Sequence, residues 1–323
     1  MQSFKPSFVA RTVFGLALLV LLIWYVDAAS IVDTFANLRP AWVVGAALLI
    51  VCAALIAAFN RHLFIDLEDK IPFVEFLPMY WVAWAMGLVI PGQVGDVATL
   101  SAILRRKGMQ WPESLGRSLL DKLISFVLMF SLGVIGVLLV AIPEVPSAGT
   151  IALLAAGTTL LAIVAVILFW QRRRISIFFS RENSALARAI GDTVHEFLDT
   201  FARHPRKVLL NAVLTLVCIG LIGMAYWCMF FSLGYTQLPP EKLILLVAAC
   251  SIVAYIPISF NGIGTVEVTG IALFGQLEVP AAAVLSAYLC LRLIVMTLAW
   301  LPAATILAFR SPVNSPEGEH KSR

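Results

Sequence analysis

The chain has 323 residues, of which 61% are hydrophobic and only 13% charged, and its mean hydropathy is +0.95. A soluble protein of this length carries about 25% charged residues, so the composition excludes a soluble globular protein. The formal net charge of +4 comes from loops that face anionic lipid, and it gives no indication of a nucleic-acid partner.

The apolar residues come in long blocks that are nearly free of charge. These blocks are residues 12–26, 41–59, 119–142, 149–170, 208–233 and 280–309. Most of them reach the roughly 20 residues that an α-helix needs to cross about 30 Å of hydrocarbon. They lack the alternation of a membrane β-strand, so helices are the remaining way to satisfy the backbone in a bilayer. We therefore predict an all-α polytopic membrane protein.

Basic residues predict how the chain is oriented, because Lys and Arg in short loops mark the cytoplasmic side of a membrane. The loop 171–207 is rich in arginine and is expected to be cytoplasmic. By the same rule, Arg61, Lys70, the basic run 105–107 and both chain termini fall on that side. The expected location is the inner, cytoplasmic membrane.

Two further apolar stretches, 72–104 and 243–277, must each begin and end on one side of the membrane to satisfy this orientation. Each is interrupted at its centre by helix-breaking residues. The breaks contain Pro91, Gly92, Gly95 and Asp96 in the first stretch, and Pro257, Asn261, Gly262, Gly264 and Glu267 in the second. Proline removes a backbone donor and glycine relaxes a helix, so each stretch is predicted to form two half-helices. We expect six full transmembrane helices and two re-entrant broken-helix hairpins.

The two halves of the chain, about 41–142 and about 208–309, follow one plan. Each has a span, then a broken hairpin that ends in an acidic residue, then a long span that bears charge. Asp96 precedes Asp121 by the same number of residues by which Glu267 precedes Arg292. The hairpins enter from opposite sides, which predicts an inverted repeat, and paired discontinuous helices in such repeats point to a transporter and its midplane site.

Ionisable groups inside a bilayer are expensive, so each is a candidate functional residue. Arg292 lies well inside an apolar span, and Glu267 on the adjacent hairpin is its expected partner. The guanidinium fork also suits a lipid phosphate. Two interpretations stay open: a permanent structural ion pair, or an Arg292 that receives a phosphate in competition with Glu267.

The first half offers a counterpart site. Asp96 is expected either to cap the following half-helix or to pair with Lys122 or Arg117. Asp121 and Lys122 open the next span and are expected to be partly exposed near the cytoplasmic surface. The backbone amides of 92–95 and 262–264 are candidates for binding an anionic headgroup at half-helix N-termini, with Asn261 adding a polar contact.

The sequence carries no motif of cofactor or metal chemistry. It has no Walker A sequence, no Gly-x-Ser-x-Gly elbow and no His-Glu-x-x-His spacing, and its five cysteines lie at irregular spacing in apolar segments. We expect no cofactor, no metal and no enzymatic activity.

The residues around the two breaks resemble the signatures of a known family. The first signature consists of Pro91, Gly92, Gly95 and Asp96, then residues 104–108 and 118–123; the second consists of residues 256–259 and 262–264, Glu267 and residues 291–293. In this order they are similar to the lysylphosphatidylglycerol synthase transmembrane-region family. The resemblance implies a flippase-like domain over residues 1–310. The polar, proline-containing composition of residues 311–323 predicts a disordered cytoplasmic tail. The resemblance also implies lipid binding or movement, while the missing soluble synthase domain implies no synthesis of aminoacyl lipid by this chain alone.

Our leading hypothesis is a transporter that moves or binds an anionic phospholipid between leaflets. The alternative is a non-catalytic scaffold, with the loop 171–207 docking a lipid-biosynthesis enzyme as partner. A membrane enzyme that uses Asp96 or Glu267 as a general base is the third hypothesis, and it lacks a second cluster of polar groups.

Overall fold

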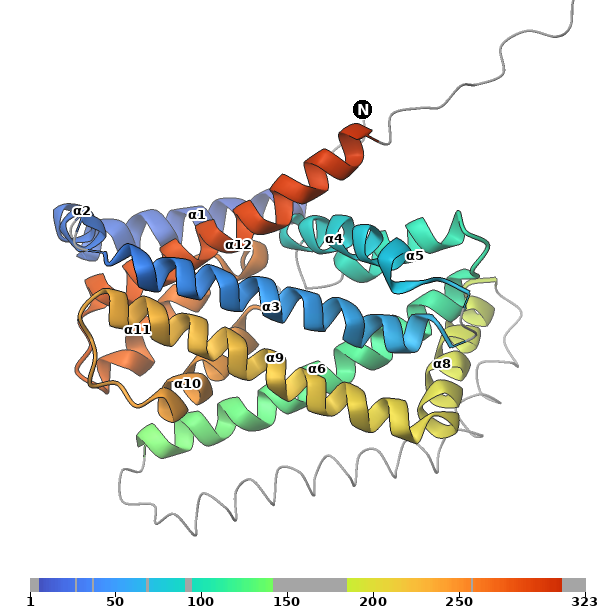
Figure 1. The fold of residues 1–323 in the computed structure, drawn as a ribbon. Helices are drawn as coiled ribbons and strands as arrows, with labels where there is room; N and C mark the ends of the chain where they lie inside the picture. The colour runs from blue at the N-terminus through green and yellow to red at the C-terminus, as the bar shows by residue number, and fades with distance from the viewer. Residues whose placement is uncertain are drawn as a thin grey trace, which may run out of the picture.

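The computed structural model describes residues 6–26, 28–36, 38–67, 70–90, 95–141, 185–256 and 258–309. Every regular element in these ranges is a helix (Figure 1). The elements are α1 (Pro6–Val26), α2 (Ala28–Ala36), α3 (Pro40–Ile65), α4 (Phe73–Val89), α5 (Gly95–Arg105), α6 (Trp111–Ala141), α8 (Ala185–Arg203), α9 (Pro205–Ser232), α10 (Pro240–Val253), the 3-10 turn η1 (Phe260–Gly262), α11 (Thr265–Gly275) and α12 (Ala281–Phe309).

Four of these helices are long and apolar enough to cross a membrane, namely α3, α6, α9 and α12. They coincide with the predicted blocks 41–59, 119–142, 208–233 and 280–309, so the all-α membrane class is confirmed. The block 12–26 lies in α1, whose apolar part is shorter. The block 149–170, the first part of the basic loop and the tail lie outside the described residues, so the count of six spans stays a prediction.

An antiparallel pair of long helices, α3 and α9, forms the centre of the bundle (Figure 1). At one end of the pair, the Ser232 hydroxyl accepts a hydrogen bond from the Arg39 amide at 2.9 Å. At the other end, the Asn60 side chain donates to the Asn211 carbonyl at 3.2 Å. These contacts fix the register of two helices that come from the two halves of the chain.

The two broken hairpins lie toward opposite ends of this central pair. In Figure 1, α4 and α5 lie on the right and α10 and α11 on the left. Both predicted breaks are present, because α4 ends at Val89 before α5 begins at Gly95, and η1 separates α10 from α11. The arrangement agrees with the predicted opposite orientation of the halves, and the re-entrant course of each hairpin in a bilayer stays a prediction.

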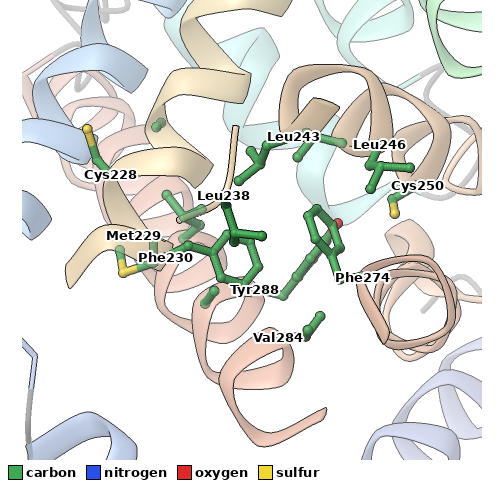
Figure 2. Packing of buried hydrophobic residues seen from close by; sticks show 14 of the residues in the cluster. Cys228, Met229, Phe230, Leu238, Leu243, Leu246, Cys250, Phe274, Val284 and Tyr288 are labelled. Atoms are coloured by element: carbon green, nitrogen blue, oxygen red, sulfur yellow. The ribbon is translucent and has the colours of Figure 1, made fainter. Parts of the chain in front are cut away.

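A hydrophobic core holds the second hairpin between α9 and α12. Figure 2 shows Phe230, Phe274 and Tyr288 packed together with leucines of α10, and the Phe230 and Phe274 ring centroids are 5.0 Å apart. Glycines let the neighbouring helices approach α10 without side chains between them. A Cβ on Gly133 would lie 2.8 Å from Ala249 Cα, and one on Gly136 would lie 2.7 Å from the Leu245 carbonyl carbon.

Of the four glycines in the pairs Gly133 and Gly136 of α6 and Gly220 and Gly223 of α9, three serve close helix packing. Gly223 meets Ile244 of α10 in the same way as Gly133 and Gly136 meet their neighbours. Gly220 is the exception, because a Cβ there would meet no atom within 4 Å. The helix α10 is therefore seated directly on the backbones of α6 and α9.

Replacing Gly136 by alanine is expected to lower stability, whereas Gly220→Ala should not. The added methyl at position 136 collides with the backbone of α10, and overpacking of this kind costs about 1–3 kcal/mol. Both substitutions raise the helix propensity by the same amount, so the difference between their unfolding midpoints reports the cost of the collision. The measurement is the apparent thermal unfolding midpoint of each purified variant in one detergent. Equal midpoints would contradict the assigned packing.

Candidate functional site

Arg61 is the centre of a buried charge network in the first half of the protein. It lies in the last turns of α3 and is 6% exposed. Its guanidinium donates to Asp96 Oδ2 at 2.8 Å through Nη1 and to Asp121 Oδ2 at 3.0 Å through Nε. The Lys122 ammonium also contacts Asp96 Oδ2, at 2.9 Å. We call these four residues the Arg61 cluster. They join α3, α5 and α6.

Two asparagines support the cluster from the central helix pair. Asn211 of α9 donates to Asp121 Oδ1 at 2.9 Å, so that carboxylate has partners on both oxygens. Asn60 of α3 donates to the Thr215 hydroxyl at 3.0 Å and to the Asn211 carbonyl. Tyr80 of α4 completes the surroundings, with the Arg61 guanidinium carbon 5.8 Å from its ring centroid. The network fixes Asp121 more firmly than Asp96.

Two expectations about this region are wrong. Arg61 does not lie in a loop but inside α3, because it neutralises two buried carboxylates. Asp121 is not partly exposed but only 5% exposed. The expected pairing of Asp96 with Lys122, one of its two candidate partners, is present.

Arg117 has a separate role at the end of the bundle. It is buried, pairs with Glu196 of α8 at 2.7 Å and with Glu113 at 2.9 Å, and donates to the Ile65 carbonyl at 3.0 Å. A Cβ on Gly116 would lie 2.6 Å from the Thr193 carbonyl oxygen, so α8 packs directly against the start of α6. Arg117 therefore ties α8 to the ends of α3 and α6 and does not contact the Arg61 cluster.

The predicted ion pair of the second half is present. Arg292 of α12 donates to Glu267 Oε1 at 2.6 Å through Nη2 and at 3.0 Å through Nε, and to the Asn261 carbonyl at 3.4 Å. Glu267 is fully buried, whereas 19% of the Arg292 side chain is exposed. We call Arg292 and Glu267 the Arg292 pair.

The second bend positions this pair through left-handed backbone. Asn261, Gly262 and Gly264 have positive φ angles of 47°, 70° and 80°. At Gly264 a Cβ would also meet the Gly15 carbonyl oxygen of α1 at 2.9 Å, so glycine is required there for two reasons. The freed Gly264 amide donates to Glu267 Oε2 at 2.7 Å and caps α11. Both oxygens of Glu267 are thereby engaged.

The remaining predicted site residues divide by position. Gly95 begins α5, where a Cβ would meet Ile90 Cβ at 2.5 Å, so it serves the close turn between the half-helices. Pro91, Gly92 and Pro257 lie outside the described residues. Within the described ranges, no group of three or more His, Cys, Asp or Glu side chains is placed to hold a metal ion, and the expectation of a metal-free protein stays a prediction.

Two cavities inside the bundle adjoin the two charged sites. One, of about 330 Å³, is lined by Arg292 and Asn261. The other, of about 280 Å³, is lined by Arg61, Asp96 and Lys122. They share the wall residues Ala57, Tyr80, Trp84, Leu88, Cys218 and Ile222. The two cavities therefore lie side by side, with Arg292 on one and the Arg61 cluster on the other, and they share a mostly apolar and aromatic wall.

The position of each charge follows one rule in both halves. The cations Arg61, Lys122 and Arg292 lie on the full-length helices α3, α6 and α12. The carboxylates on the hairpins, Asp96 and Glu267, lie in the first turns of α5 and α11. Each hairpin is thus joined to a full-length helix by the ion pair of its carboxylate.

Removing Arg61 is expected to destabilise the protein strongly. In Arg61→Met, Asp121 and Asp96 stay buried without their guanidinium, and breaking a buried pair costs about 3–5 kcal/mol. The matched control is Arg203→Met, whose pair with Asp199 is largely exposed and is worth less than about 1 kcal/mol. Unfolding midpoints in detergent measure both. A second substitution, Asp121→Asn, should recover part of the loss, and a midpoint of Arg61→Met equal to that of wild type would refute the assigned network.

The family of the chain is established by comparison with known proteins. Residues 12–303 match the family model described as lysylphosphatidylglycerol synthase TM region. No curated protein and no solved structure matches the chain. The match covers both halves, both hairpins and both charged sites. The chain therefore belongs to the lysylphosphatidylglycerol synthase TM-region family.

Proposed function

We propose that this protein moves an anionic phospholipid headgroup between the leaflets of a membrane and is not an enzyme. The observation that carries this proposal is the pair of adjoining cavities, which share one wall and place Arg292 on one cavity and the Arg61 cluster on the other. Membership of a lipid-related membrane family supports a lipid as the ligand. The headgroup would travel inside the protein, while the acyl chains stay in the bilayer.

The chemistry of the cations suits a phosphate. A guanidinium binds phosphate oxygens through two parallel hydrogen bonds, and an ammonium binds phosphate as a point charge. Arg292 and Lys122 each line a cavity and are each 19% exposed by side chain, so both are accessible to a headgroup. The carboxylates that hold them at rest act as competitors, which makes each ion pair exchangeable.

The size of the cavities agrees with a headgroup rather than a whole lipid. Ligand sites in proteins usually occupy about 300–1,000 Å³, and each cavity lies near the lower end of that range. The shared wall contains Tyr80 and Trp84 of α4, so the first hairpin lines both cavities. Movement of this hairpin is the simplest way to expose the sites alternately.

The proposal includes the membrane topology predicted from sequence, with six spans, two re-entrant hairpins and cytoplasmic termini. We expect both ends of the first hairpin to face the cytoplasm and both ends of the second to face outward. In a chain whose five cysteines are replaced by alanine, Lys70→Cys and Gln110→Cys should react with a membrane-impermeant maleimide only from the cytoplasmic side. Lys242→Cys and Gln276→Cys should react only from the other side. Labelling of Lys70→Cys and Gln110→Cys from opposite faces would contradict the re-entrant course.

The functional test is movement of fluorescent lipids in phosphatidylcholine vesicles that contain the purified chain. NBD-labelled phosphatidylglycerol, phosphatidylserine and phosphatidic acid are followed by dithionite quenching of the outer leaflet. We expect wild type to equilibrate at least one of these probes faster than protein-free vesicles. Arg292→Ala should lose at least about tenfold in rate, because one buried charge-assisted contact to phosphate is worth about 1.5–3 kcal/mol.

Two further variants separate a transport role of Arg292 from a structural one. Arg292→Met with Glu267→Gln removes both charges, so the fold no longer holds an unpaired buried carboxylate. This double variant should be folded, yet its transport rate should stay well below that of wild type. The variant Arg203→Ala on α8 should transport at the wild-type rate. Wild-type rates in the double variant would exclude Arg292 from the path. Equal rates in wild type and protein-free vesicles would favour the scaffold hypothesis.

A further inference from the structure

Two cations converge on one carboxylate oxygen in the Arg61 cluster. Asp96 Oδ2 receives Arg61 Nη1 at 2.8 Å and Lys122 Nζ at 2.9 Å. The other oxygen, Oδ1, is buried and accepts no hydrogen bond from any residue that the structure describes. Among the described residues, the Asp96 side chain thus has two partners, Arg61 and Lys122, and both line the second cavity. A phosphate oxygen that takes the place of Oδ2 therefore deprives Asp96 of both partners at once.

The charge balance of the cluster constrains what accompanies such an exchange. Arg61 and Lys122 carry two positive charges, and Asp96 and Asp121 carry two negative charges, so the resting cluster is neutral. A phosphodiester that enters adds one negative charge in surroundings of low dielectric constant. An uncompensated buried charge is very costly, and in proteins the group neutralises instead. The compensating charge has to come from a proton or another cation.

Asp96 is the group that can take up that proton. Asp121 keeps Asn211 on Oδ1 and Arg61 Nε on Oδ2 when Asp96 leaves, so its negative charge stays paired. Glu267 is engaged on both oxygens, by Arg292 and by the Gly264 amide. Asp96 alone among these carboxylates has a buried oxygen without a partner. The remaining ionisable groups that line this cavity are the phenols of Tyr80 on α4 and Tyr255 beyond α10 and the thiol of Cys218 on α9, which are all neutral near pH 7.

We infer that the headgroup and a proton move together, with the Asp96 carboxylate as the proton carrier. This inference rests on the proposed lipid transport and adds its energy coupling. The headgroup phosphate replaces Asp96 Oδ2 between Arg61 and Lys122, and Asp96 binds one proton from water on the entry side. On release, Asp96 returns to both cations and gives the proton to water on the other side. One anion and one proton cross in each cycle, so no net charge moves.

The test uses the full chain in phosphatidylcholine vesicles with NBD-labelled phosphatidylglycerol and the pH indicator pyranine in the lumen. With the membrane potential clamped at zero by valinomycin and equal potassium, a pH gradient of one unit should drive an asymmetry of up to about tenfold between leaflets, as one proton per lipid requires. Addition of unlabelled phosphatidylglycerol to the outer leaflet should acidify the lumen. A potassium diffusion potential without a pH gradient should drive nothing. Protein-free vesicles correct for passive redistribution.

The variant Asp96→Asn mimics the protonated state permanently. It should exchange probe between leaflets without a gradient, yet neither accumulate lipid in response to pH nor acidify the lumen. Asp199→Asn, a carboxylate on the surface of α8, is the matched control and should behave as wild type.

The outcomes distinguish the coupling from the transport. Probe movement by wild type that follows the membrane potential and leaves luminal pH unchanged overturns the proton coupling and keeps the proposed function. This outcome is measured with the wild-type protein alone, so it does not depend on whether Asp96→Asn folds. Absence of probe movement before any gradient is applied overturns the proposed function, and the coupling with it. Lipid-dependent acidification that persists in a folded Asp96→Asn variant overturns the assignment to Asp96.

Discussion

Charges buried in a hydrocarbon environment must be neutralised by neighbours, and this requirement organises the interior of the protein. The guanidinium of Arg61 holds together three helices that are distant in sequence, because both its carboxylate partners are buried. Arg292 and Glu267 do the same for α11 and α12. The hairpin carboxylates Asp96 and Glu267 are each paired with a cation on a long helix, whereas the pair of Arg61 and Asp121 joins two long helices. In the transport that we propose, a moving hairpin would have to break the ion pairs of its own carboxylate, which also stabilise the resting structure.

The two halves of the chain neutralise their buried charges differently, although their helices follow the same order. In the second half the carboxylate on the hairpin meets its cation on the following long helix, as Glu267 meets Arg292. In the first half the following helix carries Asp121 together with Lys122, and the preceding helix supplies Arg61. The Arg61 cluster holds its hairpin carboxylate with two cations, whereas the Arg292 pair uses one cation and a helix cap. A ligand that displaces the hairpin carboxylate thus meets a stronger competitor in the first half.

The parts of the fold that depend on local pattern could be predicted, and those that depend on tertiary burial could not. Apolar blocks predicted the four long helices, and proline and glycine predicted both breaks. The Arg292 pair could be predicted because Arg292 stands alone in an apolar span. Arg61 was misassigned because it follows the apolar run 41–59, where a basic residue has the appearance of a loop signal. Only the contact with Asp121, which is distant in sequence, shows that α3 continues past it.

The glycines that let α10 pack closely against α6 and α9 limit how these helices can move. Where Gly133, Gly136 and Gly223 bring backbones into contact, no layer of side chains is left to change rotamers and absorb sliding. The helix α10 is thereby packed tightly against α6 and α9. Within the first hairpin, Gly87 lets α4 pack directly against Asp96 of α5. In the transport that we propose, a rotation of the first hairpin would therefore carry Asp96, Tyr80 and Trp84 together, and the ion pairs of Asp96 would open as the wall between the two cavities changes shape.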